Sequence, residues 1–417
     1  MVKESTDIFG TQNERISKLA ETSSSTLWLI SPVGDSMGTT MVLKELAEPL
    51  RANNSAVEAM YIEGQIGRFL DHPNLCKVRP AVRVKGTYFL PMEFVHGETL
   101  RTLTMHALRQ NVQPRVGVIA SIGAQIARGL AHAHQAVDSK GRPLQLIHRD
   151  ISGANIMVGF DGVAKLIDFG VAQCTLGDKF RDEGQLRGKF SYMSPEQVLG
   201  LPVTQASDIF SLGTTLWEHL TCRPLFRASS PIETALRVAS HAAVPPSSLR
   251  ESIPPALDEL VLACLSAEPD ARPTAAEVAL RLDTIAQELV GGLAEQQVAN
   301  FARSFGIERM RWFDEQRRAQ QTPPRAFPRR EKTQTSSLEQ IPPFRQAQTS
   351  EHAALDPLKN QRFVGVSEGL RPMHTDDHLA TPPPLRRASP PSKVFASRVA
   401  LFAIPLAEMT HRLLTFI

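Results

Sequence analysis

The chain has 417 residues, of which 42% are apolar and 21% are charged, and its formal net charge is +3. This composition is typical of a soluble globular protein and excludes collagen-like, disulfide-stapled and wholly disordered chains. So small a net charge gives no indication of nucleic-acid binding. The cysteines lie far apart, without a Cys-x-x-Cys pair or a Cys/His cluster, so we expect a reducing compartment and no cysteine-based metal centre.

The start of the chain predicts a strand-rich unit. Residues 1–10 lack the apolar run of a secretory signal, which favours a cytoplasmic protein. Apolar or β-branched runs at 27–30, 41–43 and 87–92 are separated by turn residues and predict strands. Helical spacing over 55–70 follows an Asn-Asn-Ser start and predicts a helix within this unit.

The following part of the chain predicts helices. Long apolar periodicity covers 116–135, and 207–220 places apolar residues on one stripe behind a Ser-Asp start. A third helical pattern runs over 275–319 and is broken near Gly291 and Gly306. Parallel-sheet patterning is absent, which argues against a doubly wound fold.

The last hundred residues differ in composition from the rest. Residues 320–393 hold 12 of the chain's 30 prolines, so we predict a disordered linker that cannot bury enough apolar surface to fold. The final segment, 394–417, contains an apolar run at 399–407 that is interrupted by Pro405. This run is shorter than the roughly 20 residues needed to span a bilayer, so we expect no transmembrane segment. It could dock on the rest of the chain, on a partner or on a membrane surface.

Two short motifs carry residues suited to phosphoryl transfer. In the segment 148–155, Asp150 precedes Asn155 by five positions, so the Asp can accept a hydroxyl proton while the Asn oxygen binds Mg²⁺. A second carboxylate, Asp168, follows an apolar strand and precedes Phe169 and Gly170, as expected for a residue that holds a metal bridging nucleotide phosphates. The sequence between the motifs predicts a hairpin with an Asp-Gly turn.

These two motifs in this order resemble those of the eukaryotic-like (Hanks-type) bacterial serine/threonine protein kinases. The resemblance is greatest to the myxobacterial-type branch, where Ser rather than Lys stands two positions after the catalytic Asp, as Ser152 does here. It implies an α+β bilobal fold with a small antiparallel-sheet lobe, a larger mainly helical lobe and a disordered C-terminal tail. It also implies ATP and Mg²⁺ as cofactors, with Mn²⁺ as an alternative metal.

The resemblance assigns further residues one position at a time. Lys44 matches the phosphate-binding lysine and Glu63 its helix carboxylate, although Gly64 and Gly67 predict a loosely held helix. The segment 91–98 resembles the hinge between the lobes. The implied ATP contacts are Ala20, Thr22, Ser25, Leu27, Lys44, Met92, Glu93, Val95 and Glu98.

Other matching positions imply support or regulation rather than chemistry. Glu196 should form a buried ion pair with Arg272, and Asp208 should hydrogen-bond the backbone of the segment 148–155, which we call the catalytic loop. Arg149 stands where related kinases bind an activation-segment phosphate, and Thr175 is the hydroxyl we select as its acceptor. We interpret His148 as a packed structural histidine rather than a base.

The chain departs from the family pattern at the phosphate-covering loop. Ala20, Thr22 and Ser25 occupy the positions of its three glycines, so the backbone cannot approach phosphates as closely. We therefore expect weaker ATP binding. Near the substrate, Lys189 replaces a Thr and could restore the positive charge that Ser152 does not supply.

The sequence thus predicts a serine/threonine protein kinase that acts on protein substrates in bacterial signalling, with autophosphorylation and with an upstream kinase or a regulator as a further partner. A pseudokinase scaffold and a small-molecule kinase remain as alternatives. The predicted organisation is an N-terminal tail at 1–12, a kinase domain at 13–290 (small lobe about 13–92, large lobe about 97–290), a helical extension at 291–319, the Pro-rich linker at 320–393 and a short amphipathic segment at 394–417.

Overall fold

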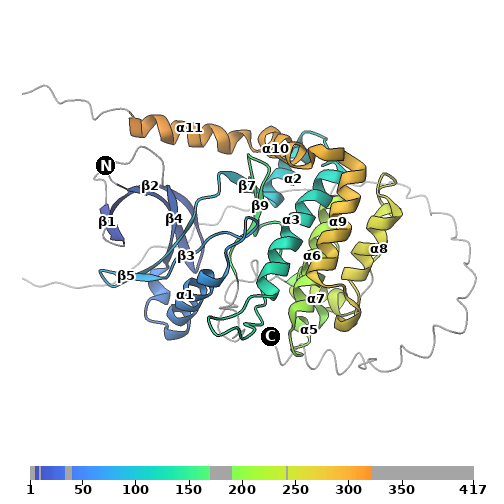
Figure 1. The fold of residues 1–417 in the computed structure, drawn as a ribbon, viewed down its shortest axis with the longest axis horizontal. Helices are drawn as coiled ribbons and strands as arrows, with labels where there is room; N and C mark the ends of the chain where they lie inside the picture. Colours follow the sequence, from blue (N-terminus) through green and yellow to red (C-terminus); the bar gives the residue numbers. More distant parts are fainter. Residues whose placement is uncertain (1–4, 9–10, 33–39, 170–189, 241–242, 322–417) are drawn as a thin grey trace, which may run out of the picture. The chain divides into compact units, whose positions relative to one another are not determined.

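The computed structural model describes residues 5–8, 11–32, 40–169, 190–240 and 243–321. Its first unit is a six-stranded antiparallel sheet with the strand order β1-β2-β3-β4-β6-β5 (Figure 1). The strands are β1 (Ser5–Ile8), β2 (Thr11–Glu21), β3 (Ser25–Pro32), β4 (Met41–Leu46), β5 (Val82–Val84) and β6 (Thr87–Glu93). The three predicted runs lie in β3, β4 and β6.

Strand β1 lies within the stretch that we expected to be an N-terminal tail. It pairs with β2 from Ser5 opposite Glu14 to Ile8 opposite Thr11. The sheet therefore begins before residue 13, because a short hairpin satisfies the backbone hydrogen bonds of this polar segment without requiring an apolar face.

One helix, α1 (Asn54–Ile66), accompanies the sheet and continues into a single 3-10 turn at Gly67–Phe69. Asn53 caps it: its side-chain oxygen accepts a hydrogen bond from the N–H of Ala56 at 3.1 Å. The predicted helix at 55–70 is confirmed, with its last turn tightened before the loop at His72.

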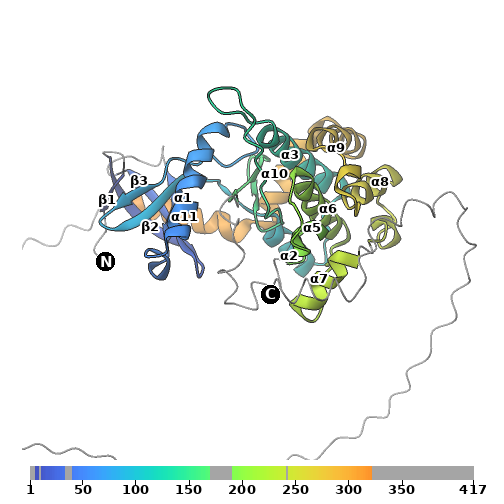
Figure 2. The same ribbon diagram turned by 90° about the horizontal axis from the view of Figure 1, so that it is seen from below.

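The larger unit is mainly helical, as the sequence predicted, and Figure 2 shows most of its helices on the side away from the sheet, while the last one extends toward the sheet. A small sheet, β7 (Gly97–Thr99), β8 (Ile156–Gly159) and β9 (Ala164–Leu166), lies at its boundary with the first unit. The helices are α2 (Leu100–Arg109), α3 (Val116–His134), α5 (Pro195–Val198), α6 (Gln205–Thr221), α7 (Pro231–Ser240), α8 (Pro255–Cys264), α9 (Ala275–Val290), α10 (Ala294–Phe305) and α11 (Ile307–Gln321). Within the described ranges, no helix is both long and apolar enough to cross a membrane.

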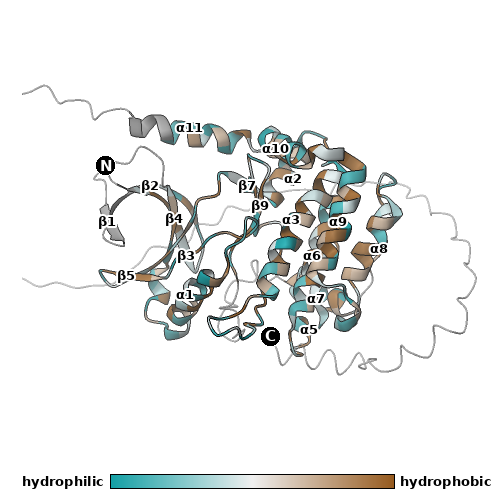
Figure 3. Cartoon of the chain, viewed as in Figure 1, coloured by the Kyte–Doolittle hydropathy of each residue, from teal (hydrophilic) through white to brown (hydrophobic). Residues whose placement is uncertain are grey.

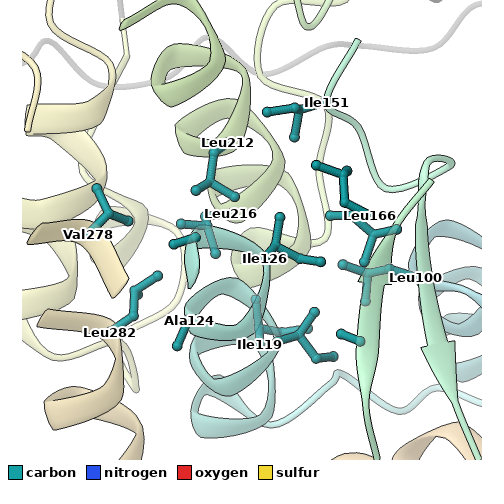
Figure 4. Close-up of a cluster of buried hydrophobic side chains, with 14 of the residues drawn as sticks. Leu100, Ile119, Ala124, Ile126, Ile151, Leu166, Leu212, Leu216, Val278 and Leu282 are labelled. Atoms are coloured by element: carbon teal, nitrogen blue, oxygen red, sulfur yellow. The ribbon is translucent and has the colours of Figure 1, made fainter. Parts of the chain in front are cut away.

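The core of the helical unit lies between α3, α6 and α9, whose apolar faces meet (Figure 3). Figure 4 shows Ile126 of α3 and Leu216 of α6 in this cluster, with Leu282 of α9 beside them. Ile151 from the catalytic loop and Leu166 from β9 join the same cluster and are fully buried. The loops that carry Asp150 and Asp168 are thus attached directly to the core of the helical unit.

The breaks predicted in the long helical pattern are confirmed: α9 ends before Gly291, and α10 ends before Gly306. The predicted hairpin is also present as β8 and β9, where the N–H of Gly159 donates to the carbonyl of Val163 at 2.8 Å. Residues 322–417, which include the predicted linker and the C-terminal segment, lie outside the described residues.

A buried ion pair joins two distant parts of the helical unit. Arg272 donates to both carboxylate oxygens of Glu196, at 2.6 and 2.9 Å, and its side chain is fully buried. Burial would raise the pKa of Glu196, but the hydrogen bonds from Arg272 and Ser207 hold it below the usual value. The predicted Glu196–Arg272 contact is present in the structure.

Replacing Arg272 with Met should destabilise the fold, because the Glu196 carboxylate would stay buried without its partner. We expect the free energy of unfolding in urea to fall by about 3–5 kcal/mol. The control is Arg281→Met, since Arg281 is exposed on α9. Equal losses in the two variants would contradict a special role for this pair.

His219 of α6 lies directly beneath the catalytic loop. Its Nδ1 is 2.8 Å from the hydroxyl of Thr104, and a Cβ placed on Gly153 would be 2.2 Å from its Nε2. Position 153 must therefore be glycine for this histidine to fit. Burial lowers the pKa of His219 to about 4, so the imidazole is neutral in the folded protein at neutral pH.

This buried histidine should make the protein sensitive to acid. Between about pH 6.5 and pH 4 the unfolded chain protonates the imidazole and the folded chain does not, so stability decreases as the pH falls through this range. We expect His219→Leu to reduce the slope of unfolding free energy against pH there, measured by urea denaturation. An unchanged slope would show that His219 does not cause it.

Candidate functional site

Lys44 is the residue at which three elements meet. Its Nζ, carried by β4, lies 3.2 Å from both carboxylate oxygens of Glu63 in α1. The same nitrogen lies 3.0 Å from Oδ1 of Asp168, which follows β9. The structure therefore brings together three residues that the sequence singled out from positions far apart in the chain.

Two carboxylates balance the charge of the Lys44 side chain, which is partly buried and 18% exposed. Burial by itself would lower the pKa of Lys44, but the negative charges of Asp168 and Glu63 raise it above the usual value. Lys44 is consequently charged at neutral pH. A fixed positive charge next to two carboxylates suits the binding of a polyanion together with a cation.

The position of Glu63 depends on close packing of α1. Glu63 is 7% exposed, and at the neighbouring Gly64 a Cβ would lie 2.6 Å from the backbone nitrogen of Ala81. Our expectation of a loosely held helix assigned only a conformational cost to Gly64 and Gly67. The structure gives these glycines a second role, since they allow α1 to lie against the chain at 78–81.

The catalytic loop is held by Asp208 at the start of α6. Its two carboxylate oxygens accept hydrogen bonds from the N–H groups of His148 and Arg149, both at 2.8 Å. His134 approaches the same carboxylate at 2.9 Å, a contact that the sequence analysis did not predict. Because Asp208 is fully buried, these bonds fix the backbone immediately before Asp150.

His148 packs in the interior next to Phe169. Their ring centroids are 4.7 Å apart, and Nε2 of His148 lies 3.1 Å from the carbonyl oxygen of Ile167. Burial lowers the pKa of His148, so it is a neutral structural side chain. This arrangement links the loop that carries Asp150 to the segment that carries Asp168.

Asn155 and Asp150 are joined through the loop itself. The side-chain nitrogen of Asn155 donates to the carbonyl of Asp150 at 2.7 Å, and the N–H of Ile167 donates to the carbonyl of Asn155 at 2.9 Å. Because the side-chain nitrogen of Asn155 makes this hydrogen bond, its side-chain oxygen is the atom that can bind a cation. A carboxylate and an amide oxygen are the ligand types that Mg²⁺ prefers.

The segment expected to cover the phosphates is a tight turn between β2 and β3. The N–H of Thr22 donates to the carbonyl of Ser25 at 2.8 Å, and the Thr22 hydroxyl accepts the N–H of Ser25 at 3.0 Å. The carbonyl of Ser24 accepts the N–H of Ala47, which ties the turn to the end of β4. Two backbone donors that a glycine-rich loop would offer to phosphates are thus used within the turn.

The expected hinge residues contribute to an apolar cluster that spans both units. Met92 is buried and packs with Val42, and Leu27 and Val95 lie partly buried beside them. The N–H of Glu93 donates to the carbonyl of Lys77 at 2.8 Å, and the carbonyl of Glu93 accepts a hydrogen bond from Sγ of Cys76 at 3.7 Å. The cluster also includes Leu19, Cys76, Val78, Phe94 and Ile167.

Some of the remaining site residues expected from the sequence lie within the described part of the chain, and others lie outside it. Ala20 and Glu98 are both described: Ala20 is exposed in β2, opposite Leu27, and Glu98 lies in β7. Arg149 lies in the catalytic loop with a positive φ of 67°. Thr175 and Lys189 lie outside the described residues.

Two sets of contacts were missed by the sequence analysis. Lys165 of β9 forms an ion pair with Glu93 at 2.9 Å and so joins the hinge to the helical unit. Asn74 donates to Gln125 and to the carbonyl of Ala164, through bonds of 3.2 and 2.8 Å. Neither contact has a sequence signal, since the partners are far apart in the chain and their types are common on surfaces.

Comparisons with known proteins agree with this arrangement. A family model described as "Protein kinase domain" matches residues 31–281. The tyrosine-protein kinase MasK of Myxococcus xanthus is 31% identical over 297 residues, which cover 70% of this chain and 46% of that protein. The serine/threonine-protein kinase PknL of Mycobacterium tuberculosis is 32% identical over 258 residues, covering 61% of this chain and 57% of that protein.

A third relative, the serine/threonine-protein kinase PrkC of Bacillus subtilis, is 31% identical over 227 residues, or 54% of this chain and 33% of that protein. The chain therefore spans from a third to just over half the length of these three curated relatives. The two-unit fold with its antiparallel sheet agrees with the family match, which covers more than half of the chain. The chain belongs to the protein kinase domain family.

Proposed function

We propose that this chain is a bacterial serine/threonine protein kinase that transfers the γ-phosphoryl group of ATP to proteins, itself included. The observation that carries the proposal is the contact of Lys44 with both Glu63 and Asp168. A protein that only bound partners would have no need for a buried ammonium between two carboxylates next to a fixed Asp150–Asn155 loop. The similarity to MasK supports our assignment to the myxobacterial-type branch.

The roles of the residues follow from where they lie. Lys44 would neutralise the charge of the phosphates, and Glu63 would hold the Lys44 side chain in the orientation that this requires. Asp150 would orient the acceptor hydroxyl and accept its proton. Mg²⁺ held by Asn155 and Asp168 would neutralise charge that develops on the phosphoryl oxygens. Among the described residues, no group of three or more His, Cys, Asp or Glu side chains could hold a metal ion.

The named relatives differ in the amino acid that they phosphorylate. PknL and PrkC are named serine/threonine kinases, whereas MasK is named a tyrosine kinase. We favour serine and threonine on the catalytic-loop motif, and we propose a cytoplasmic reaction because the cysteines are widely separated in sequence. We further propose that 13–290 is the catalytic domain and that the segments after it serve regulation or partner binding.

One observation favours a pseudokinase scaffold as a second candidate. The turn at 22–25 uses the N–H groups of Thr22 and Ser25 internally, so it is poorly suited to hold phosphates. A scaffold would bind nucleotide weakly or not at all and would transfer no phosphate. The two experiments below separate this candidate from an active kinase.

Asp150→Asn should abolish transfer while leaving the fold intact, because the amide cannot accept the hydroxyl proton. With labelled ATP and Mg²⁺, we expect labelling of the protein itself and of a generic protein acceptor to fall by about 10²–10⁴-fold. The control is Asp270→Asn, since Asp270 is exposed and distant in sequence from both motifs. Phosphoamino acid analysis of the wild-type product should show phosphoserine or phosphothreonine. Wild-type protein without transfer would favour the scaffold, and phosphotyrosine alone would correct the specificity.

The turn at 22–25 should lower the affinity for ATP, because its backbone N–H groups are used within the turn. Calorimetric titration with MgATP is expected to give binding weaker than the micromolar range. In Thr22→Gly the hydroxyl that holds the N–H of Ser25 is gone, so we expect affinity to increase by about threefold to tenfold, or on the order of 1 kcal/mol. Ser23→Gly serves as the control within the same turn. Ordinary micromolar binding by the wild type, unchanged in Thr22→Gly, would contradict this interpretation.

A further inference from the structure

Helix α11, which follows the matched kinase region, packs on the segment between the two lobes. Phe313 of α11 is 7% exposed, and its ring lies 5.0 Å from that of Phe94 and 4.7 Å from that of His96. These two residues flank Val95, whose side chain belongs to the apolar cluster with Met92. Phe313 therefore contacts the neighbours of Val95, while Val95 itself packs on the side of the proposed nucleotide site.

Helix α10, which directly precedes the helix that carries Phe313, is fixed to the large lobe. Arg303 of α10 donates to the carbonyl of Phe160 at 2.7 Å, and Nδ1 of His106 donates to the carbonyl of Phe305 at 2.9 Å. The ring of Phe160 also lies 5.1 Å from that of His96. Figures 1 and 2 both show α11 leaving α10 and extending toward the sheet. The contact thus connects the 94–96 segment to a support outside the 31–281 region.

Arg309 places a positive charge in the same contact. Its guanidinium carbon lies 4.8 Å from the centroid of Trp312 and 5.0 Å from that of Phe313, which holds it over the aromatic cluster. Burial lowers the pKa of Arg309, and the negative charge of Glu98 acts in the opposite direction. Glu98 is one of the expected ATP contacts, so the charge of Arg309 acts on the far end of the segment 94–98 as well.

We propose that Phe313 and Arg309 are positioning residues for nucleotide binding, which act by fixing the backbone of 94–98 through the contacts of Phe313 with Phe94 and His96. This inference rests on the proposed function, because it assumes that Val95 and Glu98 meet ATP. The contacts are made by residues that the family match does not include. Removing them should change nucleotide affinity without changing the groups around Lys44.

The test is Phe313→Ala in the full chain, with Phe313→Leu as the conservative variant. The matched control is Ile307→Ala, which removes apolar bulk from the same helix at a position that is 46% exposed. We expect Phe313→Ala to weaken MgATP binding and raise KM for ATP by about threefold to tenfold, with kcat within about twofold. Phe313→Leu should restore most of the affinity, and Arg309→Gln should weaken it to a lesser extent.

Hydrogen exchange at the amides of 94–98 in nucleotide-free protein gives a measurement that does not depend on catalysis. Exchange there should be faster in Phe313→Ala than in Ile307→Ala, at equal thermal stability of the rest of the domain. Unchanged MgATP affinity or unchanged exchange in Phe313→Ala would overturn the inference while leaving the proposed function intact. Wild-type protein that binds no nucleotide would overturn both, and that result is seen before any variant is made.

Discussion

The arrangement of the site depends on the burial of one positive charge. An ammonium group loses its hydration when it is buried, and it stays charged only where carboxylates replace that hydration. Lys44 meets this condition by contacting Glu63 and Asp168 at once. Since these residues belong to the sheet, to α1 and to the segment after β9, the same electrostatic requirement holds two units of the fold in a defined relation.

Asp208 is a further buried carboxylate, and it accepts hydrogen bonds from backbone N–H groups rather than from an ammonium. It contacts no residue of the candidate chemistry through its own charge but accepts backbone N–H groups on either side of the His148–Arg149 bond. A buried carboxylate is stabilised by such donors, and the donors in turn lose their freedom to move. The loop that carries Asp150 is therefore anchored to α6, in the core of the helical unit, before any nucleotide is bound.

Two features distinguish this chain from the family pattern. The phosphate-covering turn lacks the expected glycines, and helix α11 lies outside the residues that match the family model. The turn at 22–25 satisfies its own backbone donors, which reduces what it can offer to phosphates. The contact of Phe313 with Phe94 and His96 lies outside the matched region and supports the segment next to Val95. In the proposed kinase, nucleotide affinity would therefore depend less on the phosphate-covering turn and more on the segment between the lobes.

The sequence alone determined the family and most element positions, and it singled out Lys44, Glu63 and Asp168, which the structure brings together. Asp150, Asn155 and Asp168 occur at short fixed spacings, and the apolar periodicity of α3 and α6 is local, so both can be read along the chain. Only the tertiary structure decided which distant groups meet, such as Lys165 with Glu93 or His219 with Gly153. It also placed the polar strand β1 in the sheet and buried Phe313 against the hinge. Contacts of this kind depend on packing between segments far apart in sequence, and no periodicity or spacing within one segment encodes them.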